Sequence, residues 1–353
     1  MKLLLKVKLS LNIINMKNNL YFIAEIGLNH NGDLSLAKEM IDAAVTSGAN
    51  AVKFQSITAN KLVSKTEFKK KILGGFGLDG VKTVGDFWKK VSINKIFHTE
   101  VKNYCDKKKI EFFSTPFDFE SVDLLEKLSV NKYKIASGDL THLPLLEYVA
   151  KKNKMVILST GGSFIDEIEK SYNHLLKFGA PKVAILHCVS LYPTTAKLVN
   201  LHVIELLKQK FDTDIGFSDH TLGIHLPLAA IAKGATIIEK HFTLDKNMPG
   251  PDQAISSDPK ELSELVRLGN EVYEANKQKK KIISDDEMKI RPLMRRSIVA
   301  SKDIQAGETI SMDNIDFKRP GDGLSPETAI EIIGKKLINK IGKDHQIKSN
   351  NIK

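Results

Sequence analysis

GFSDHTLGIHLPLAAIAKGATIIEKHFTLDKNMPGPD, residues 216–252, is the stretch that decides the fold of this chain. Its pattern predicts a strand over 214–219, an apolar helix over 224–234 that a glycine ends, and a second strand over 236–242. Two strands joined through a helix are typical of a parallel sheet.

Polar side chains share one face at the end of each of these two strands. Side chains alternate along a strand, so Ser218 lies on the same face as His220, and Glu239 on the same face as His241. Such pairs are unusual, because strands buried in a parallel sheet are normally apolar. A single histidine of this kind is most simply a core residue with its hydrogen bonds satisfied. Two histidines at equivalent strand ends favour a metal site, because imidazole is a common metal ligand.

The preceding part of the chain repeats the alternation of strand and helix. Amphipathic stretches such as 34–49, which Asp33 caps and Gly48 ends, separate the strands. Six further strands are predicted, at 21–27, 51–55, 111–117, 132–137, 155–160 and 183–189. Eight β/α units over about 250 residues predict an α/β protein with a (β/α)8 TIM barrel. The alternative, a doubly wound open sheet, usually has a Gly-rich phosphate loop after its first strand, where this chain has GLNHNGD.

Four segments are predicted along the chain. They are an N-terminal extension (1–18), the barrel with its closing helix (19–282), a polar linker (283–294) and a small C-terminal module (295–353). Within the barrel, residues 56–110 hold a Gly-rich loop, GGFGLDG, which predicts a lid or substrate loop at the barrel mouth. A module of about sixty residues is near the lower limit for independent folding, so it should dock on another surface.

Composition restricts the classes of function. The chain is 42% hydrophobic and 27% charged, as in a globular protein, and its net charge is +11. The lysines are scattered without interleaved aromatic residues, which argues against nucleic-acid binding. Cys105 and Cys188 form no CxxC pair and predict reduced thiols in a cytoplasmic protein, with Cys188 a small apolar residue of its strand. The start, MKLLLKVKLSLNIINM, is too short and too charged to span a membrane and lacks a signal-peptide cleavage site.

The C-terminal ends of the predicted strands, where TIM barrels carry their chemistry, are polar. Lys53 and Lys134 lie inside apolar strands, where an unpaired lysine is costly. Other polar side chains follow the strands: Glu25, Asn29, His30, Gln55, Ser114, Thr115, Ser137, Ser159, Thr160, Ser190, Tyr192 and Asp252. Two lysines and several hydroxyl groups around one mouth predict a cradle for an anion that carries phosphate and carboxylate.

A series of motifs carries a family resemblance. They are, in order, AEIGLNHNGD, AVKFQ, FFSTPFD, KIASGD, ILSTGG, HCVSLYPT, GFSDHTLGIH, IEKHFTLDKNMPGPD and KRPGDG. Over roughly residues 20–350 the chain resembles the sialic acid synthase family. These enzymes are phosphoenolpyruvate-dependent nonulosonic acid synthases with a C-terminal antifreeze-like (SAF) domain. STPFDFESVDLL and KNMPGPD resemble the N-acetylneuraminate and N,N'-diacetyllegionaminate branches, whereas the pseudaminate branch lacks the MPGPD loop.

The resemblance implies a role for each matching residue. Phosphoenolpyruvate would be held by Lys53, Thr115, Lys134, Ser137, Ser159, Ser190 and Ser218. His220 and His241 would bind a divalent ion, manganese in the first place and otherwise magnesium or cobalt. Glu25 would be the acid/base of a catalytic set completed by His220, His241 and Asp252. The sugar would contact Gln55, Asp139, Tyr192, Glu239 and Arg319. Asp139 and Ser190 stand where the family often has Glu and Asn, which bears on the choice of sugar.

The resemblance also implies an assembly and a reaction. The small domain would cap the barrel of a partner chain, in a domain-swapped homodimer with Arg319 acting in trans. C3 of phosphoenolpyruvate would attack the aldehyde of an open-chain N-acetylated mannose-type sugar, after which water adds and phosphate leaves. The alternatives are a pseudaminate synthase, another metal-dependent barrel enzyme that condenses phosphoenolpyruvate with an aldose, and a non-catalytic carbohydrate-binding protein. The last should have lost Glu25, His220 or His241, and all three are present.

Overall fold

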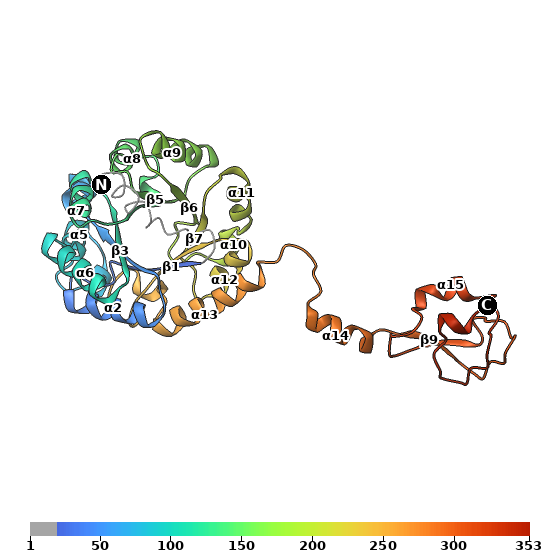
Figure 1. Cartoon of the computed structure of the whole chain (residues 1–353). Helices are drawn as coiled ribbons and strands as arrows, with labels where there is room; N and C mark the ends of the chain where they lie inside the picture. Colours follow the sequence, from blue (N-terminus) through green and yellow to red (C-terminus); the bar gives the residue numbers. More distant parts are fainter. Residues whose placement is uncertain (1–19) are drawn as a thin grey trace, which may run out of the picture. The chain divides into compact units, whose positions relative to one another are not determined.

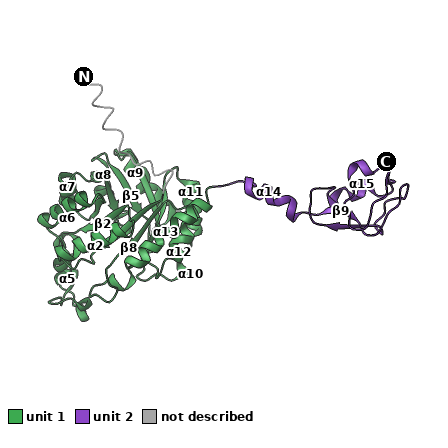
Figure 2. Cartoon of the chain, turned by 60° about the horizontal axis from the view of Figure 1, so that its bottom comes forward, with its two compact units in different colours: residues 1–277 green, residues 278–353 purple. Residues whose placement is uncertain are grey.

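The computed structural model describes residues 20–353 in two compact units, one up to Lys277 and the other Gln278–Lys353 (Figure 2). The N-terminal extension predicted over 1–18 lies outside the described residues.

The first unit is the predicted parallel barrel. Within residues 20–277, eight parallel strands pair in the order β3-β2-β1-β8-β7-β6-β5-β4. The two ends of this order, β3 and β4, lie side by side, so the sheet curls into a nearly closed barrel inside a ring of helices (Figure 1). The strands are β1 (Tyr21–Gly27), β2 (Ala51–Ser56), β3 (Glu111–Pro116), β4 (Lys132–Ile135), β5 (Met155–Ser159), β6 (Val183–Cys188), β7 (Ile215–Asp219) and β8 (Ile237–His241). The predicted fold is confirmed, and the predicted strand boundaries differ from the observed ones by at most two residues.

Helices cover the outside of the barrel, and local sequence signals set their limits. Asp33 accepts hydrogen bonds from the backbone of Ser35 and Leu36 and so caps α2, while Gly234 follows α12 at a φ of 96°. The helices of this unit are α2 (Leu34–Thr46), α3 (Ala59–Leu62), α4 (Lys65–Phe68), α5 (Val84–Val91), α6 (Lys95–Lys108), α7 (Phe119–Lys127), α8 (Leu143–Ala150), α9 (Ile165–Lys177), α10 (Ala196–Val199), α11 (His202–Lys210), α12 (His225–Ala232) and α13 (Pro259–Ala275).

Each strand faces two different surroundings. Outward residues such as Phe54 and Phe217 belong to the large apolar cluster between sheet and helices. Inward residues form a second cluster that fills the lower barrel: Tyr21, Ile23, Ala51, Phe113, Ile157, Ala184, Leu186 and Ile237. The apolar filling stops one step short of the strand ends, where the inward positions become polar.

Glycine at position 216 lets β7 lie close to its neighbours. A Cβ atom there would meet the carbonyl oxygen of Ile237 at 2.4 Å and Cδ2 of Leu186 at 2.5 Å. Any larger residue would force β7 away from β8, and with it the Ser218 and His220 positions.

The long connection between β2 and β3 forms its own lobe. It contains α3 to α6 and a 3₁₀ turn, η2 (Gly74–Gly77), and packs around Leu78, Val81, Phe87 and Val91. Its Gly-rich loop contacts the loop after β8, because the Gly250 amide donates to the Phe76 carbonyl at 2.9 Å. Asn31, in the loop after β1, donates to the Pro249 carbonyl at 2.8 Å. Three loops of the barrel mouth are therefore linked.

The second unit has a small core of its own, formed by Ile298, Ala300, Ile304, Ile310, Ile315, Ala329, Ile332, Leu337, Ile341 and Ile347. Its elements are α14 (Asp285–Met294), the antiparallel pair β9 (Ser297–Ala300) and β10 (Ile315–Lys318), η5 (Pro326–Thr328), α15 (Ala329–Ile332) and η6 (Ser349–Asn351). The segment 283–294, expected to be a linker, thus holds a helix. Ser284 caps it and three acidic residues occupy its first turn.

None of the helices within residues 20–353 combines the length and the apolar character that a membrane crossing requires.

Candidate active site

A cavity of about 390 Å³ opens at the C-terminal end of the barrel strands. Most of the polar residues singled out from the sequence line it: Glu25, Lys53, Gln55, Thr115, Lys134, Ser137, Ser159, Ser190, Tyr192, Ser218, His220, Glu239 and His241. Phe117, Ala136, Gly138, Gly161 and Cys188 complete the lining. The inward polar positions of all eight strands therefore meet in one place, as barrel geometry requires.

Two lysines and two glutamates form a buried charge network at the cavity floor. Lys53 Nζ lies 2.8 Å from Oε2 of Glu25 and 3.8 Å from Oε2 of Glu239. Lys134 Nζ lies 3.4 Å from Oε1 of Glu239. Neither lysine is left unpaired, which removes the main cost of placing them in apolar strands.

The two glutamates differ in acidity. Burial raises the pKa of Glu25, which the nearby Lys53 only partly offsets. Burial acts on Glu239 in the same way, but Lys134 and Lys53 together hold its pKa below the ordinary value. Two carboxyl groups whose pKa values are pushed apart can divide the roles of proton carrier and fixed charge. Glu25 is the one suited to carry a proton.

Hydroxyl groups and a backbone amide surround the lysines. Lys53 donates to Thr115 Oγ1 at 3.3 Å, and Lys134 donates to Ser159 Oγ at 2.6 Å. Gly161 donates its amide to Ser137 Oγ at 2.9 Å. A Cβ atom on Gly161 would meet Ser190 Oγ at 2.2 Å, so only glycine allows the hydroxyls of Ser137 and Ser190 to approach this loop. The result is a compact set of donors for an anion.

The two histidines lie together in the same cavity. Their ring centroids are 5.4 Å apart, and the ring of Tyr192 lies 4.1 Å from that of His220. His220 Nδ1 donates to the Val189 carbonyl at 2.9 Å, so in the neutral ring Nε2 is the nitrogen that accepts. Burial lowers the pKa of His220, but Cys188 and the Val189 carbonyl outweigh burial and raise this pKa above its ordinary value. Burial lowers the pKa of His241 well below its ordinary value, so this ring is neutral.

These residues fit a weakly held divalent ion. His241 Nδ1 is buried without a hydrogen-bond partner among the described residues, and Oδ2 of Asp252 is 3.7 Å away. An unpaired buried nitrogen is costly, so a ligand is expected there. Within residues 20–353, no group of three or more His, Cys, Asp or Glu is arranged to hold a metal. An ion bound by two imidazoles would take its other ligands from water or substrate, as catalytic ions do.

Seven of the polar residues singled out from the sequence do not line the cavity: Asn29, His30, Ser114, Thr160, Asp139, Asp252 and Arg319. Asn29 donates to the Phe242 carbonyl, Ser114 bonds to Ser56, Thr160 donates to the Leu186 carbonyl, and His30 stacks on Phe54. Burial raises the pKa of Asp252 to about 6, and this residue lies beside His241 just outside the lining. Asp139 belongs to a 3₁₀ turn after β4, next to Gly138. Arg319 is exposed and belongs to the second unit. The sugar contacts of Asp139 and Arg319 and the catalytic role of Asp252 remain predictions.

Cys188 is the small apolar residue of β6 that the sequence predicts, and it also lines the cavity, which the sequence interpretation missed. It lies at an inward position two residues after Leu186, and its Sγ is 3.9 Å from His220 Nδ1. Counting two residues along β6 from Leu186 would have placed Cys188 in the cavity.

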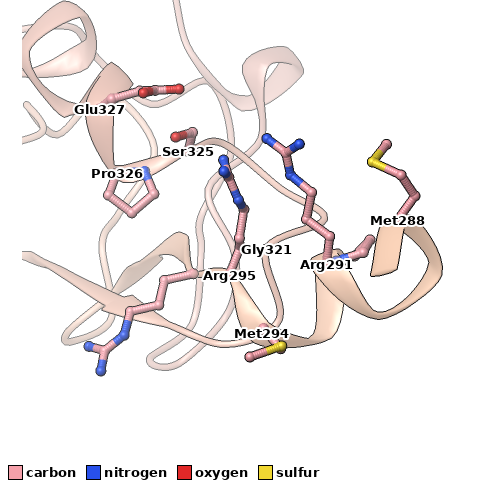
Figure 3. A pocket seen from close by; sticks show the side chains of 10 residues that line it. Met288, Arg291, Met294, Arg295, Gly321, Ser325, Pro326 and Glu327 are labelled. Atoms are coloured by element: carbon pink, nitrogen blue, oxygen red, sulfur yellow. The ribbon is translucent and has the colours of Figure 1, made fainter. Parts of the chain in front are cut away.

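A second cavity, of about 540 Å³, lies within the small unit. Figure 3 shows it with Met288 and Arg291 on one side and Ser325, Pro326 and Glu327 on the other. The Gly321 amide donates to the Pro292 carbonyl at 2.6 Å, which ties α14 to the turn that carries Arg319.

Comparison with known proteins agrees with this geometry. The model of the NeuB family matches residues 40–281, and that of the SAF domain matches residues 295–353. The chain is 43% identical to the N,N'-diacetyllegionaminic acid synthase of Campylobacter jejuni, over 94% of this chain and 100% of that protein. It is 38% identical to the enzyme of the same name from Legionella pneumophila, over 90% of each chain. A crystal structure of N-acetylneuraminic acid (sialic acid) synthetase from Leptospira borgpetersenii, with citrate, superimposes with a TM-score of 0.70 at 37% identity, over 77% of this chain and 90% of that one. This chain therefore belongs to the NeuB family, with a SAF domain at its C-terminal end.

Proposed function

We propose that this protein is a nonulosonic acid synthase. It condenses phosphoenolpyruvate with an open-chain N-acetylated mannose-type sugar and water, and releases phosphate and a nine-carbon 2-keto acid. The observation that carries the proposal is the buried network of Glu25, Lys53, Lys134 and Glu239, beside a pair of histidines and a ring of hydroxyl groups. This arrangement offers an anion site, a proton carrier and an electrophilic site in one cavity.

The anion site suits phosphoenolpyruvate. Lys53 and Lys134 would neutralise its phosphate and carboxylate, and the hydroxyls would orient them: Thr115, Ser137, Ser159, Ser190 and Ser218. Because the lysines already have carboxylate partners, they are held in place before substrate binds.

The chemistry proceeds in three bond changes. The C2–C3 electron pair of phosphoenolpyruvate attacks the aldehyde carbon, water adds at C2, and the C2–O bond to phosphate breaks. Glu25 accepts the proton that the water loses and returns it to the oxygen of the former aldehyde, and the remaining proton of the C2 hydroxyl leaves with phosphate as the C2 carbonyl forms. His220 and His241 would hold a divalent ion, which would polarise the aldehyde oxygen as a Lewis acid. Lys53 and Lys134 stabilise the departing phosphate.

The sugar lies against the remaining wall of the cavity. Gln55, Tyr192 and Glu239 line the cavity and would contact the sugar, together with Asp139 and Asp252. We further propose a domain-swapped homodimer in which Arg319 of each chain reaches the sugar site of the other. The two free, buried cysteines suit a cytoplasmic enzyme.

One experiment can identify which sugar the protein uses. Two of the relatives are N,N'-diacetyllegionaminic acid synthases. This similarity makes 2,4-diacetamido-2,4,6-trideoxymannose, rather than N-acetylmannosamine, the sugar that we propose for this protein. Pure protein with Mn²⁺ and phosphoenolpyruvate should release phosphate with the first sugar, more slowly with the second, and least with the altrose isomer of the first. Mass spectrometry should detect the matching nine-carbon acid. Phosphate release with a phosphorylated aldose alone would support a different condensing enzyme, and no release with any of them would contradict the proposal.

Glu25→Gln should lower kcat by on the order of a hundredfold or more. The amide keeps the size of the side chain and can still accept from Gln55 Nε2, which lies 3.2 Å from Oε1 of Glu25. Phosphoenolpyruvate binding and the melting temperature should change little. The matched control is Glu111→Gln, because Glu111 also pairs with a strand lysine, Lys132, at 2.9 Å, but at the other end of the barrel. A near-normal rate in Glu25→Gln, or an equal loss in the control, would show that Glu25 is structural.

A further inference from the structure

A second buried ion pair joins the two histidine-bearing strands on their outer face. Asp219 and Lys240 are register partners in β7 and β8, each one residue away from a histidine of the cavity. Because side chains alternate, these two point away from the cavity that His220 and His241 line. The side chain of Lys240 is 2% exposed and that of Asp219 is 0% exposed.

The pair holds the backbone on both sides of His220. Lys240 Nζ lies 2.6 Å from Oδ2 of Asp219 and donates to the Thr221 carbonyl at 2.7 Å. The Thr221 amide in turn donates to Oδ1 of Asp219 at 2.9 Å. Residues 219 and 221 are thus both attached to one side chain of β8, next to His241.

A gain in folding stability is not a sufficient reason for a buried ion pair at this position. A buried ion pair must overcome the loss of hydration of both charges, and apolar residues of similar volume are often as good or better. What the pair adds is a fixed geometry, because Lys240 reaches a loop carbonyl that no aliphatic side chain could bind.

We infer that Asp219 and Lys240 are positioning residues that set the separation and orientation of the two ion-binding imidazoles. The inference rests on the proposed ion at His220 and His241. His220 is held from the inner side by its bond to the Val189 carbonyl, and the Thr194 amide donates to the His220 carbonyl at 2.9 Å. The Asp219–Lys240 pair supplies the link to β8, which these two contacts do not provide.

The chain contains a matched control. Lys132 and Glu111 form another buried lysine–carboxylate pair between barrel strands, 2.9 Å apart, at the N-terminal ends of β4 and β3. It shares the chemistry of the Asp219–Lys240 pair but is far along the strands from the histidines. A purely structural effect should appear in both pairs.

The test measures Mn²⁺ affinity directly, by the electron paramagnetic resonance signal of free Mn²⁺, together with melting temperature. Lys240→Met should bind Mn²⁺ about 10- to 100-fold more weakly, the range for residues that orient metal ligands. Asp219→Leu with Lys240→Met should recover melting temperature relative to Lys240→Met, because no lone charge stays buried, yet should keep the weak affinity. Lys132→Met, and Glu111→Leu with Lys132→Met, should bind Mn²⁺ as the unmodified protein does.

The outcomes separate the two proposals. If the unmodified protein binds no Mn²⁺, the proposed ion site is wrong and the inference is overturned with it. If the unmodified protein binds Mn²⁺ and both Lys240 variants bind it equally well, the inference alone is overturned. Equal weakening in the Lys132 variants would also overturn it, since the effect would then be a general loss of barrel stability.

Discussion

Removing divalent ions should abolish the condensation, and adding Mn²⁺, Co²⁺ or Mg²⁺ should restore it. This result is expected because only two imidazoles, His220 and His241, converge in the described cavity. Structural zinc sites normally use four protein ligands, so an ion with two should exchange with the solvent and be lost to a chelator. Phosphate release after treatment with chelator, followed by addition of each ion, is the measurement.

Substitutions test the same point without a chelator. His220→Asn and His241→Asn should each lose Mn²⁺ binding and activity. His187→Asn is the control, because this buried histidine of β6 donates instead to the Val199 carbonyl at 2.6 Å, outside the cavity. Full turnover in protein shown to be free of metal would refute the ion assignment.

Arg319→Ala and His220→Ala should each be inactive alone, yet partly active when the two chains are mixed. If the small domain reaches the partner's barrel, each active site needs His220 from one chain and Arg319 from the other. A mixed dimer then has one complete site and one that lacks both groups. Random pairing makes half of the dimers mixed, so co-expression should recover roughly a quarter of the unmodified activity.

The complementation needs two checks. Two different affinity tags, purified in sequence, establish that mixed dimers form. Arg267→Ala should remain active, because this exposed arginine pairs with Glu271 on the surface of α13. Mixed dimers as inactive as their parents would mean that Arg319 acts within its own chain or has no catalytic role.

The sequence was sufficient for the barrel because its strands are short apolar runs between capped helices. Alternation then placed Ser218, His220, Glu239 and His241 on inward positions, and all four line the cavity. Alternation does not identify the inward face of β6, because this strand is buried on both faces and shows no apolar–polar pattern. The position of Cys188 in the cavity is therefore not predictable from its strand alone.

Other features depended on information that a local pattern does not hold. The polar composition of residues 283–294 predicts a linker, yet the segment holds α14, in which Pro292 lies near the C-terminal end and costs few backbone hydrogen bonds. Asp139 and Ser137 lie in one turn, but only Ser137 lines the cavity, and no local pattern in KIASGD separates the two residues. The proposed role of Arg319 would depend on an assembly of two chains, which a single-chain pattern does not encode.

Both faces of β7 and β8 carry functional or positioning residues, and this restricts the mutations that the two strands can tolerate. Glu239 and His241 occupy inward positions of β8, and Lys240 occupies the outward position between them. Deleting one codon ahead of Glu239 would exchange the two faces, turning Lys240 into the cavity and both functional groups toward the helices. A substitution in these strands changes one face only, whereas an insertion or deletion changes both, so insertions and deletions must be confined to the loops beyond the strand ends.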